Sequence, residues 1–505
     1  MLFNSYLFLL VFLPLVLAGF YGVGQLAGRT GGLLWLVVAS LIFYASWELS
    51  YLWLLLASLL FNYLAALLIR KLPRYRRLCL WIAVLANVAL LFYFKLVIAV
   101  FGGNGAAFST THHILIPLGI SFITFQQIAF LVDTYKGKLT EGSALEYVLF
   151  ITFFPQLIMG PIVHYRELQP QFRKAGLFRW NPDNFSLGMC IFIVGLFKKV
   201  VLADSIAPFV DGVYGSIAQG ESIAPIDAWV AALGFTLQIY FDFSAYSDMA
   251  IGLARMLNIN LPINFDAPYR AVNRFDYWRR WHISFGAFMR QYVFFPLARA
   301  KTFKVGHVGA LAVTTLVSGF WHGLGATFIV WGALQSLLML GVHYRGVIAG
   351  KLGLSYRKRG FPWFSMLLTF LVTVLLGVLF RSSDLQVAFG MYEQMMVAVQ
   401  TIFAGDITAL YQHIDRTFDR WVLINLVLML LIVWGMPSTR RLFARHWTAL
   451  DQRASSPEKT APDLLPWFRH QVFGLSRRWA IIMAALLCSA LIFMSGTSRF
   501  IYYQF

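Results

Sequence analysis

The chain has 505 residues, of which 59% are hydrophobic and only 12% are charged, and its net charge is +19. Soluble domains contain about 25% charged residues, so this composition excludes an ordinary soluble domain. Basic chains often bind nucleic acid, but here Lys and Arg gather in loops between apolar segments, as they do in the cytoplasmic loops of membrane proteins. The composition therefore predicts an all-α polytopic membrane protein.

Apolar stretches of about 20 residues, the length that crosses a bilayer, recur from one end of the chain to the other. The first, Met1–Tyr21, lacks the basic start and the clear small-residue cleavage site of a secretory signal, so we interpret it as a span. We expect about 12 transmembrane helices. Their approximate positions are residues 4–21, 33–48, 50–69, 78–101, 113–132, 186–204, 226–243, 306–321, 325–343, 362–381, 421–437 and 480–497.

The basic residues also predict which loops stay in the cytoplasm. Most of them fall in alternate loops, an arrangement that places both termini outside. The expected cytoplasmic loops are Arg70–Arg77, Arg345–Arg359 and Arg440–Arg478, the last within a basic loop at 438–479. The expected external loops are Gly102–His113, Ser205–Pro225 and Ser382–Asp419. Because no internal repeat or globular unit interrupts this pattern, residues 1–505 are expected to form one membrane domain.

Two segments do not fit the pattern of simple spans. Glu146–Ile162 is apolar, but basic residues flank both of its ends and Pro155 interrupts a helix. We expect a re-entrant segment, which is tolerated where its backbone packs within protein. Lys198 and Lys199 fall inside the span proposed at 186–204, and the simplest explanation is that this helix starts or bends differently.

The sequence contains no GxxxxGK[ST] phosphate loop and no HExxH metal helix. This argues against an ATP-driven pump and a zinc protease. The three cysteines lie in apolar runs whose spacing suits neither a zinc site nor a disulfide framework, so no metal site is expected. The remaining functional candidates are polar residues within or beside apolar spans, where burying a polar side chain costs free energy.

The strongest of these is His322, which lies between two apolar helices in the segment Ser318–Gly325, beside Trp321 and among glycines. An ionisable residue below a membrane surface is a functional candidate by default. Imidazole titrates near neutrality, so it can take a proton from an attacking hydroxyl. The alternative is a histidine that only hydrogen-bonds a neighbouring helix.

A second candidate is the segment Tyr277–Ser284, within a stretch at 244–305 that we expect to form cytoplasmic interfacial helices. If this region forms one continuous helix, its aromatic residues lie on one face and its basic residues on another. This is the pattern of a helix that lies at the membrane interface. The stripe is Trp281, Phe285, Phe288, Tyr292 and Phe295, and the other face carries Arg279, Gly286 and Arg290. This pattern is explained either by membrane anchoring or by the mouth of a site for an anionic donor such as a coenzyme A thioester. The donor-binding candidates are Asn273, Trp278, Arg279, Arg280 and Trp281.

Two weaker candidates lie in other spans. Asp242 ends an apolar span and Asp248 follows it, so Asp242 is either functional or an interfacial carboxylate that caps a helix or pairs with an arginine. Gln126 and Gln127 are expected to form hydrogen bonds between helices.

Taken together, these segments resemble the membrane-bound O-acyltransferase superfamily, and most closely its bacterial polysaccharide-acetylation branch. The Trp-Arg-Arg-Trp-His-Ile-Ser that ends at Ser284, followed by Phe-Trp-His-Gly at Gly323, is the most specific signal. The matching segments are Pro117–Phe125, Gln156–Arg166, Gly195–Asp204, Gln238–Gly252, Pro268–Ser284 and Ser318–Gly323. They define an expected catalytic core at 113–343.

The resemblance implies that His322 is the catalytic histidine and that His282 is a second histidine on the donor side. It also implies a ring of helices around a central tunnel in the bacterial inner membrane. The implied donor is acetyl-CoA, with no permanently bound cofactor. The implied partners are a periplasmic SGNH-type acetyltransferase and exopolysaccharide machinery, with an alginate- or cellulose-like acceptor. The segment Pro296–Arg299 departs from the branch's usual Pro-Leu-Gly-Gly, which leaves the polymer open.

Two other functions remain open from the sequence. A transporter or flippase of a lipid-linked or acyl substrate would also have many helices and buried polar groups, although it would more often show repeated halves. An acyltransferase of this superfamily could also modify a lipid or a protein.

Overall fold

The computed structural model describes residues 1–101, 117, 119–139, 142–300, 306–351, 362–405, 420–444, 473–474 and 476–494. Every regular element in these ranges is a helix, which confirms the all-α prediction. The N-terminal helices are η1(Phe8–Phe12), α1(Leu13–Leu26), α2(Gly28–Ala45), α3(Ser50–Lys71), α4(Arg76–Phe101) and α5(Ile120–Tyr135). The middle helices are α6(Ala144–Thr152), α7(Phe154–Leu157), α8(Tyr165–Phe172), α9(Pro182–Phe197), η2(Lys198–Ala203), α10(Asp204–Ala218) and α11(Pro225–Met256).

The second half of the chain begins with short helices and continues with longer ones. The short ones are η3(Pro268–Arg270), α12(Arg274–Arg280), α13(Ile283–Phe288), η4(Met289–Phe294) and α14(Phe295–Arg299). They are followed by α15(Gly306–His322), α16(Ala326–Lys351), α17(Pro362–Arg381), α18(Leu385–Phe403), α21(Arg420–Gly435), α22(Thr439–Leu442) and α23(Arg477–Phe493).

Among the described residues, seven helical segments are long and apolar enough to cross a membrane. They coincide with seven of the expected spans and support a multi-pass membrane protein. The five other expected spans correspond to α5, α11, α15, α21 and α23, which are shorter or more polar. α11, for example, is 32 residues long but carries Asp242 and Asp248 in its interior.

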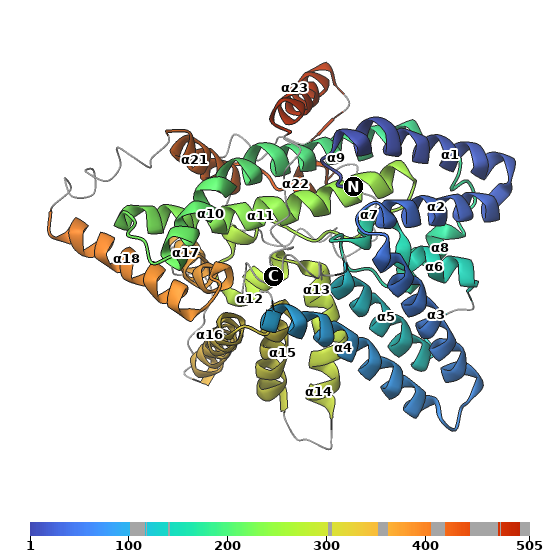
Figure 1. The fold of residues 1–505 in the computed structure, drawn as a ribbon, viewed down its shortest axis with the longest axis horizontal. Helices are drawn as coiled ribbons and strands as arrows, with labels where there is room; N and C mark the ends of the chain where they lie inside the picture. The colour runs from blue at the N-terminus through green and yellow to red at the C-terminus, as the bar shows by residue number, and fades with distance from the viewer. Residues whose placement is uncertain are drawn as a thin grey trace.

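α11 is the central helix of the molecule and is buried along almost its whole length. Figure 1 shows it beside α9 and α10, with α12 and α13 on its other side. Glycines let α9 and α11 approach backbone to backbone, since a Cβ on Gly188 would lie only 2.6 Å from the carbonyl oxygen of Gly252. This packing holds α11 rigidly next to the site described below.

The segment Ser382–Asp419, expected as an external loop, contains the helix α18 in its first half, and its side of the membrane stays a prediction. The Asp384 side chain caps this helix by accepting a hydrogen bond from the Val387 amide at 2.9 Å. Only one stripe of α18 is buried, against α10, α11 and α17, and polar residues such as Glu393 and Gln394 interrupt its apolar sequence, so the sequence does not predict it as a span. Residues 406–419 lie outside the described residues.

The segment Glu146–Ile162 folds as two short buried helices, α6 and α7, separated at Phe153. The nine residues of α6 span roughly 14 Å, less than half of a bilayer core of about 30 Å. The segment therefore does not cross as one helix, in agreement with the sequence analysis. Pro155 lies in the first turn of α7, where its missing N–H is tolerated.

Lys198 and Lys199 begin the π-helical turn η2, which joins α9 to α10 without interrupting the helical segment Pro182–Ala218. Lys199 is buried and its Nζ lies 2.6 Å from Asp242 and 2.7 Å from Asp204. Paired carboxylates on α10 and α11 therefore make a lysine tolerable inside this long helix.

Candidate active site

The backbone breaks at His282, between α12 and α13. His282 adopts a left-handed conformation with φ 44°, which is uncommon for a residue other than glycine. The prediction of one continuous helix through this region is therefore wrong. Phe285 and Phe288, expected at the membrane interface, are buried against other rings, as is Trp281. The break turns the imidazole of His282 into the protein interior.

Asn264 holds the break in place. Its Oδ1 accepts hydrogen bonds from the backbone N–H and the hydroxyl of Ser284, at 3.2 and 2.9 Å, and lies 3.1 Å from Nδ1 of His282. A backbone N–H can only donate, so the atom shared by these groups is the amide oxygen, and Nδ1 of His282 must carry a hydrogen toward it. Nε2 of His282 has no hydrogen-bonding partner within the described residues. Nothing local in the sequence marks Asn264, so the motifs do not predict its role.

The charge state of His282 follows from its surroundings. The residue lies between two short helices that do not span a membrane, and burial lowers the pKa of its imidazole. The ring is therefore neutral near pH 7, with a lone pair on Nε2. A neutral imidazole in this tautomer can accept a proton or a hydrogen bond from a group that enters the site.

His322 ends α15 and is also buried. Its ring packs against Trp321, Phe380 and Trp331, with centroids 4.6, 4.9 and 5.4 Å away. Nζ of Lys95 on α4 donates a hydrogen bond to the carbonyl oxygen of His322 at 2.9 Å. The cation therefore lies at the C-terminal end of α15, where a helix attracts positive charge.

One aromatic pair connects the two histidines. Phe285 and Trp321 stack with their centroids 4.5 Å apart. His282 packs on Phe285 at 5.0 Å, and His322 packs on Trp321 at 4.6 Å. The structure thus brings together two residues that lie 40 positions apart in the sequence.

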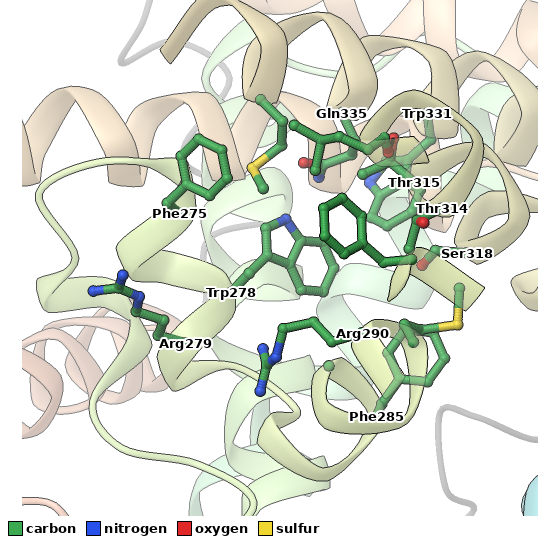
Figure 2. Close-up of a pocket in the computed structure, with 15 residues that line it drawn as sticks. Phe275, Trp278, Arg279, Phe285, Arg290, Thr314, Thr315, Ser318, Trp331 and Gln335 are labelled. Carbon is green, nitrogen blue, oxygen red and sulfur yellow. Dashed lines mark hydrogen bonds between the residues drawn. The ribbon is translucent and has the colours of Figure 1, made fainter. Parts of the chain in front are cut away.

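A cavity of about 310 Å³ lies beside this pair. Figure 2 shows Arg279 and Arg290, both exposed, on one side of it and the hydroxyls of Thr314, Thr315 and Ser318 on the other. Its interior is mostly apolar and is bounded by Phe275, Trp278, Phe285, Met289, Phe294, Leu311, Trp331 and Met339. The cavity combines a basic rim with an apolar interior.

His322 lines a second, smaller cavity of about 50 Å³. The two cavities share Trp278, Trp331 and Gln335 as a common wall. Trp281 and Arg274 also line the smaller one. The catalytic candidate and the basic rim therefore lie on opposite sides of a partition formed by two tryptophans and one glutamine.

Some of the predicted donor-binding residues line the cavities, and others make structural contacts instead. Trp278 and Arg279 line the larger cavity, and Trp278 and Trp281 line the smaller. Arg280 instead forms an ion pair with Asp276 at 2.9 Å. The Asn273 side chain caps α12 by accepting a hydrogen bond from the Asp276 amide. Arg274 and Gln335 also line cavities. The sequence predicts no donor-binding role for them, because a local pattern does not distinguish them from neighbouring basic and apolar residues.

The remaining candidates line neither cavity. Asp242 lies in the interior of α11 rather than at its end, and its partner is Lys199 instead of an arginine. Gln127 bonds Ser58 on α3 and the Tyr147 hydroxyl on α6, as expected for an inter-helix group. Gln126 is buried on α5.

Comparison with known proteins adds independent evidence. The model of the membrane-bound O-acyltransferase family matches residues 20–380. The chain is 39% identical to a peptidoglycan O-acetyltransferase of Helicobacter pylori over 78% of this chain and 80% of that protein. It is 35% identical to a probable alginate O-acetylase of Pseudomonas syringae, over 78% and 75% of the two chains. A probable alginate O-acetylase of Azotobacter vinelandii is 30% identical over 100% of both.

Proposed function

Since the chain belongs to the membrane-bound O-acyltransferase family, we propose that it moves an acetyl group from cytoplasmic acetyl-CoA to a hydroxyl acceptor outside the membrane. The family and its named relatives make it an O-acyltransferase and a multi-pass protein of the inner membrane. The identity of the donor and the direction of transfer are part of the proposal. The observation that carries it is the placement of His282 and His322 around one aromatic pair beside a cavity with a basic rim.

The larger cavity supports an acyl-CoA donor. Arg279 and Arg290 at its rim suit the phosphates of coenzyme A, because guanidinium groups match phosphate geometry. The apolar interior suits the less polar arm that carries the thioester. The acetyl group would then approach the wall of Trp278 and Trp331, behind which His322 lies. We take the two cavities as neighbouring sections of the tunnel expected from the sequence.

The chemistry assigned to His322 is general-base catalysis. An acceptor hydroxyl has a pKa far above neutrality, so it attacks a thioester slowly unless a base removes its proton as the new bond forms. A positioned imidazole contributes about 10²–10⁴-fold to such a step. His282 packs on Phe285, which lines the donor cavity. The proposed role of its Nε2 is to orient or polarise the donor.

The proposed final acceptor is a polysaccharide outside the cell membrane. Relatives named for peptidoglycan and alginate both concern sugar polymers, and the choice between polymers stays open. A periplasmic SGNH-type partner would pass the acetyl group on within exopolysaccharide machinery. The other acceptors that the sequence leaves open are a lipid and a protein.

The test uses the purified protein in liposomes, with acetyl-CoA labelled on the acetyl group and supplied on one side. The proposal expects label on an added polysaccharide or SGNH-type partner on the opposite side, with free coenzyme A remaining where it was supplied. A transporter would instead move the intact donor across. Absence of any acetyl transfer with every acceptor tried would overturn the proposal.

A further inference from the structure

Arg274 is a buried cation whose side chain has only neutral partners. It lies in the first turn of α12 and is 4% exposed. Its guanidinium donates to Thr373 Oγ1 on α17 and to Gln335 Oε1 on α16, both at 2.8 Å, and lies over the ring of Tyr277 at 4.3 Å. In the described part of the chain, no carboxylate lies within ion-pair distance of Arg274, and its buried Nε has no hydrogen-bonding partner.

A purely structural role does not explain this charge. Burying a cation without an anionic partner is costly, and a neutral side chain could bridge the same oxygens more cheaply. Arg270, which is also buried, provides a contrast. Its guanidinium donates to the carbonyl oxygens of Val433, at 2.8 Å, and Met436, at the C-terminal end of α21. That end carries partial negative charge, which compensates the cation.

The position of Arg274 indicates what would compensate its charge. Arg274 and its two partners line the same small cavity as His322. A cation here faces the space in which, under the proposed function, the acceptor hydroxyl meets the acyl carbon. The negative charge that this reaction develops would therefore arise beside Arg274, a fixed cation among the described residues that line this cavity.

We infer that Arg274 stabilises the oxyanion of the acyl-transfer step, an inference that rests on the proposed function. The hydroxyl oxygen bonds to the thioester carbon while His322 takes its proton, and the electron pair of the C=O double bond moves to the oxygen. The C=O bond then re-forms, the C–S bond breaks, and coenzyme A leaves as a thiol with the proton from His322. Arg274 lowers the barrier by holding positive charge in place before the oxyanion forms.

The experiment compares kcat and KM for acetyl-CoA in wild-type, Arg274→Gln, Arg274→Lys and Arg270→Gln proteins, with thermal midpoints as the measure of folding. Arg274→Gln is expected to lower kcat by about 10²–10³-fold, the effect of removing one oxyanion donor, with little change in KM. Arg274→Lys keeps the charge and should recover part of kcat. Arg270→Gln should lower the midpoint but leave kcat of the folded fraction unchanged.

A folded Arg274→Gln protein with wild-type kcat would overturn the inference. If Arg274→Gln does not fold, the Arg274→Lys variant provides the test. A folded Arg274→Lys protein that is as inactive as His322→Ala would also overturn the inference. An inactive wild-type protein would refute the proposed function itself, and the role of Arg274 with it. An active wild-type protein whose rate does not depend on Arg274 refutes only the inference.

Discussion

His322 and His282 are held by different means, so their contributions can be separated. His322→Ala is expected to abolish acetyl transfer, because the acceptor hydroxyl loses its base, an effect of about 10²–10⁴-fold or more. His282→Ala should impair transfer less completely, because its proposed role is to orient or polarise the donor. The initial rate of labelled acetyl transfer in liposomes, at matched amounts of reconstituted protein, measures both effects.

His343→Ala is the matched control for these variants, since His343 lies on α16 and lines neither cavity. It should retain the wild-type rate. Size-exclusion profiles and thermal midpoints establish that each variant is folded. A folded His322→Ala protein with near wild-type transfer would return His322 to a structural role.

The exposed arginines at the cavity rim are expected to act on donor binding. Replacing Arg279 and Arg290 by Gln should raise KM for acetyl-CoA more than it lowers kcat, because their charges would contact phosphates rather than the reacting atoms. Added salt should raise the wild-type KM in the same direction, since exposed charges are screened.

Arg280→Gln tests the earlier assignment, made from sequence, of Arg280 to the donor. Its ion pair with Asp276 predicts a smaller rise in KM than at Arg290. A larger rise at Arg280 would restore that assignment. Loss of membrane insertion in the Arg279 and Arg290 variant, with an unchanged KM, would show that these arginines are anchors.

At the residue scale, motifs pointed to His282, His322, Trp278, Trp281 and Arg279, but not to Trp331 or to the residues that support the histidines. Asn264 lies 18 residues before His282 and reaches it only because the chain breaks and turns. Arg274 stands in the same motif as His282, yet its distinguishing feature is that it has no acidic partner among the described residues, which only the folded environment shows.

At the scale of elements, the contact between α15 and α16 positions His322. A Cβ on Gly319 would lie 2.7 Å from the carbonyl oxygen of Phe328, which is backbone and cannot move aside cheaply. Gly319→Ala is therefore expected to separate the two helices, lower the thermal midpoint and reduce kcat. Gly341→Ala on α16 is the control, because a Cβ there meets nothing within 4 Å. Equal midpoints and rates for the two variants would contradict this account.

The helices that sequence predicted well are those whose apolar residues fill a whole span, such as α3 and α17. It failed where tertiary contacts decide the structure. One example is the break at His282, since a 3.6-residue stripe runs through it without interruption. Another is α18, whose stability comes from a single buried stripe against α10, α11 and α17.

At the scale of the whole molecule, the basic loops predict the orientation of the protein in the membrane. We expect Arg345–Arg359 in the cytoplasm and Gly102–His113 outside. The first loop begins within α16 and continues beyond the described residues, and the second lies wholly outside them. Single cysteines in each loop, in a background lacking Cys79, Cys190 and Cys488, can be labelled with an impermeant thiol reagent on intact cells. Labelling of the first loop from outside would reverse the topology.

The shared wall of Trp278, Trp331 and Gln335 bears on the energy supply of the cell. A passage through an enzyme between the two faces of a membrane can let protons leak across. In the tunnel proposed above, two indole rings and one amide side chain separate the two cavities. Protons cross a membrane along an unbroken file of water, and this wall would interrupt that file. The proposed transfer of acyl groups would then leave the membrane potential intact.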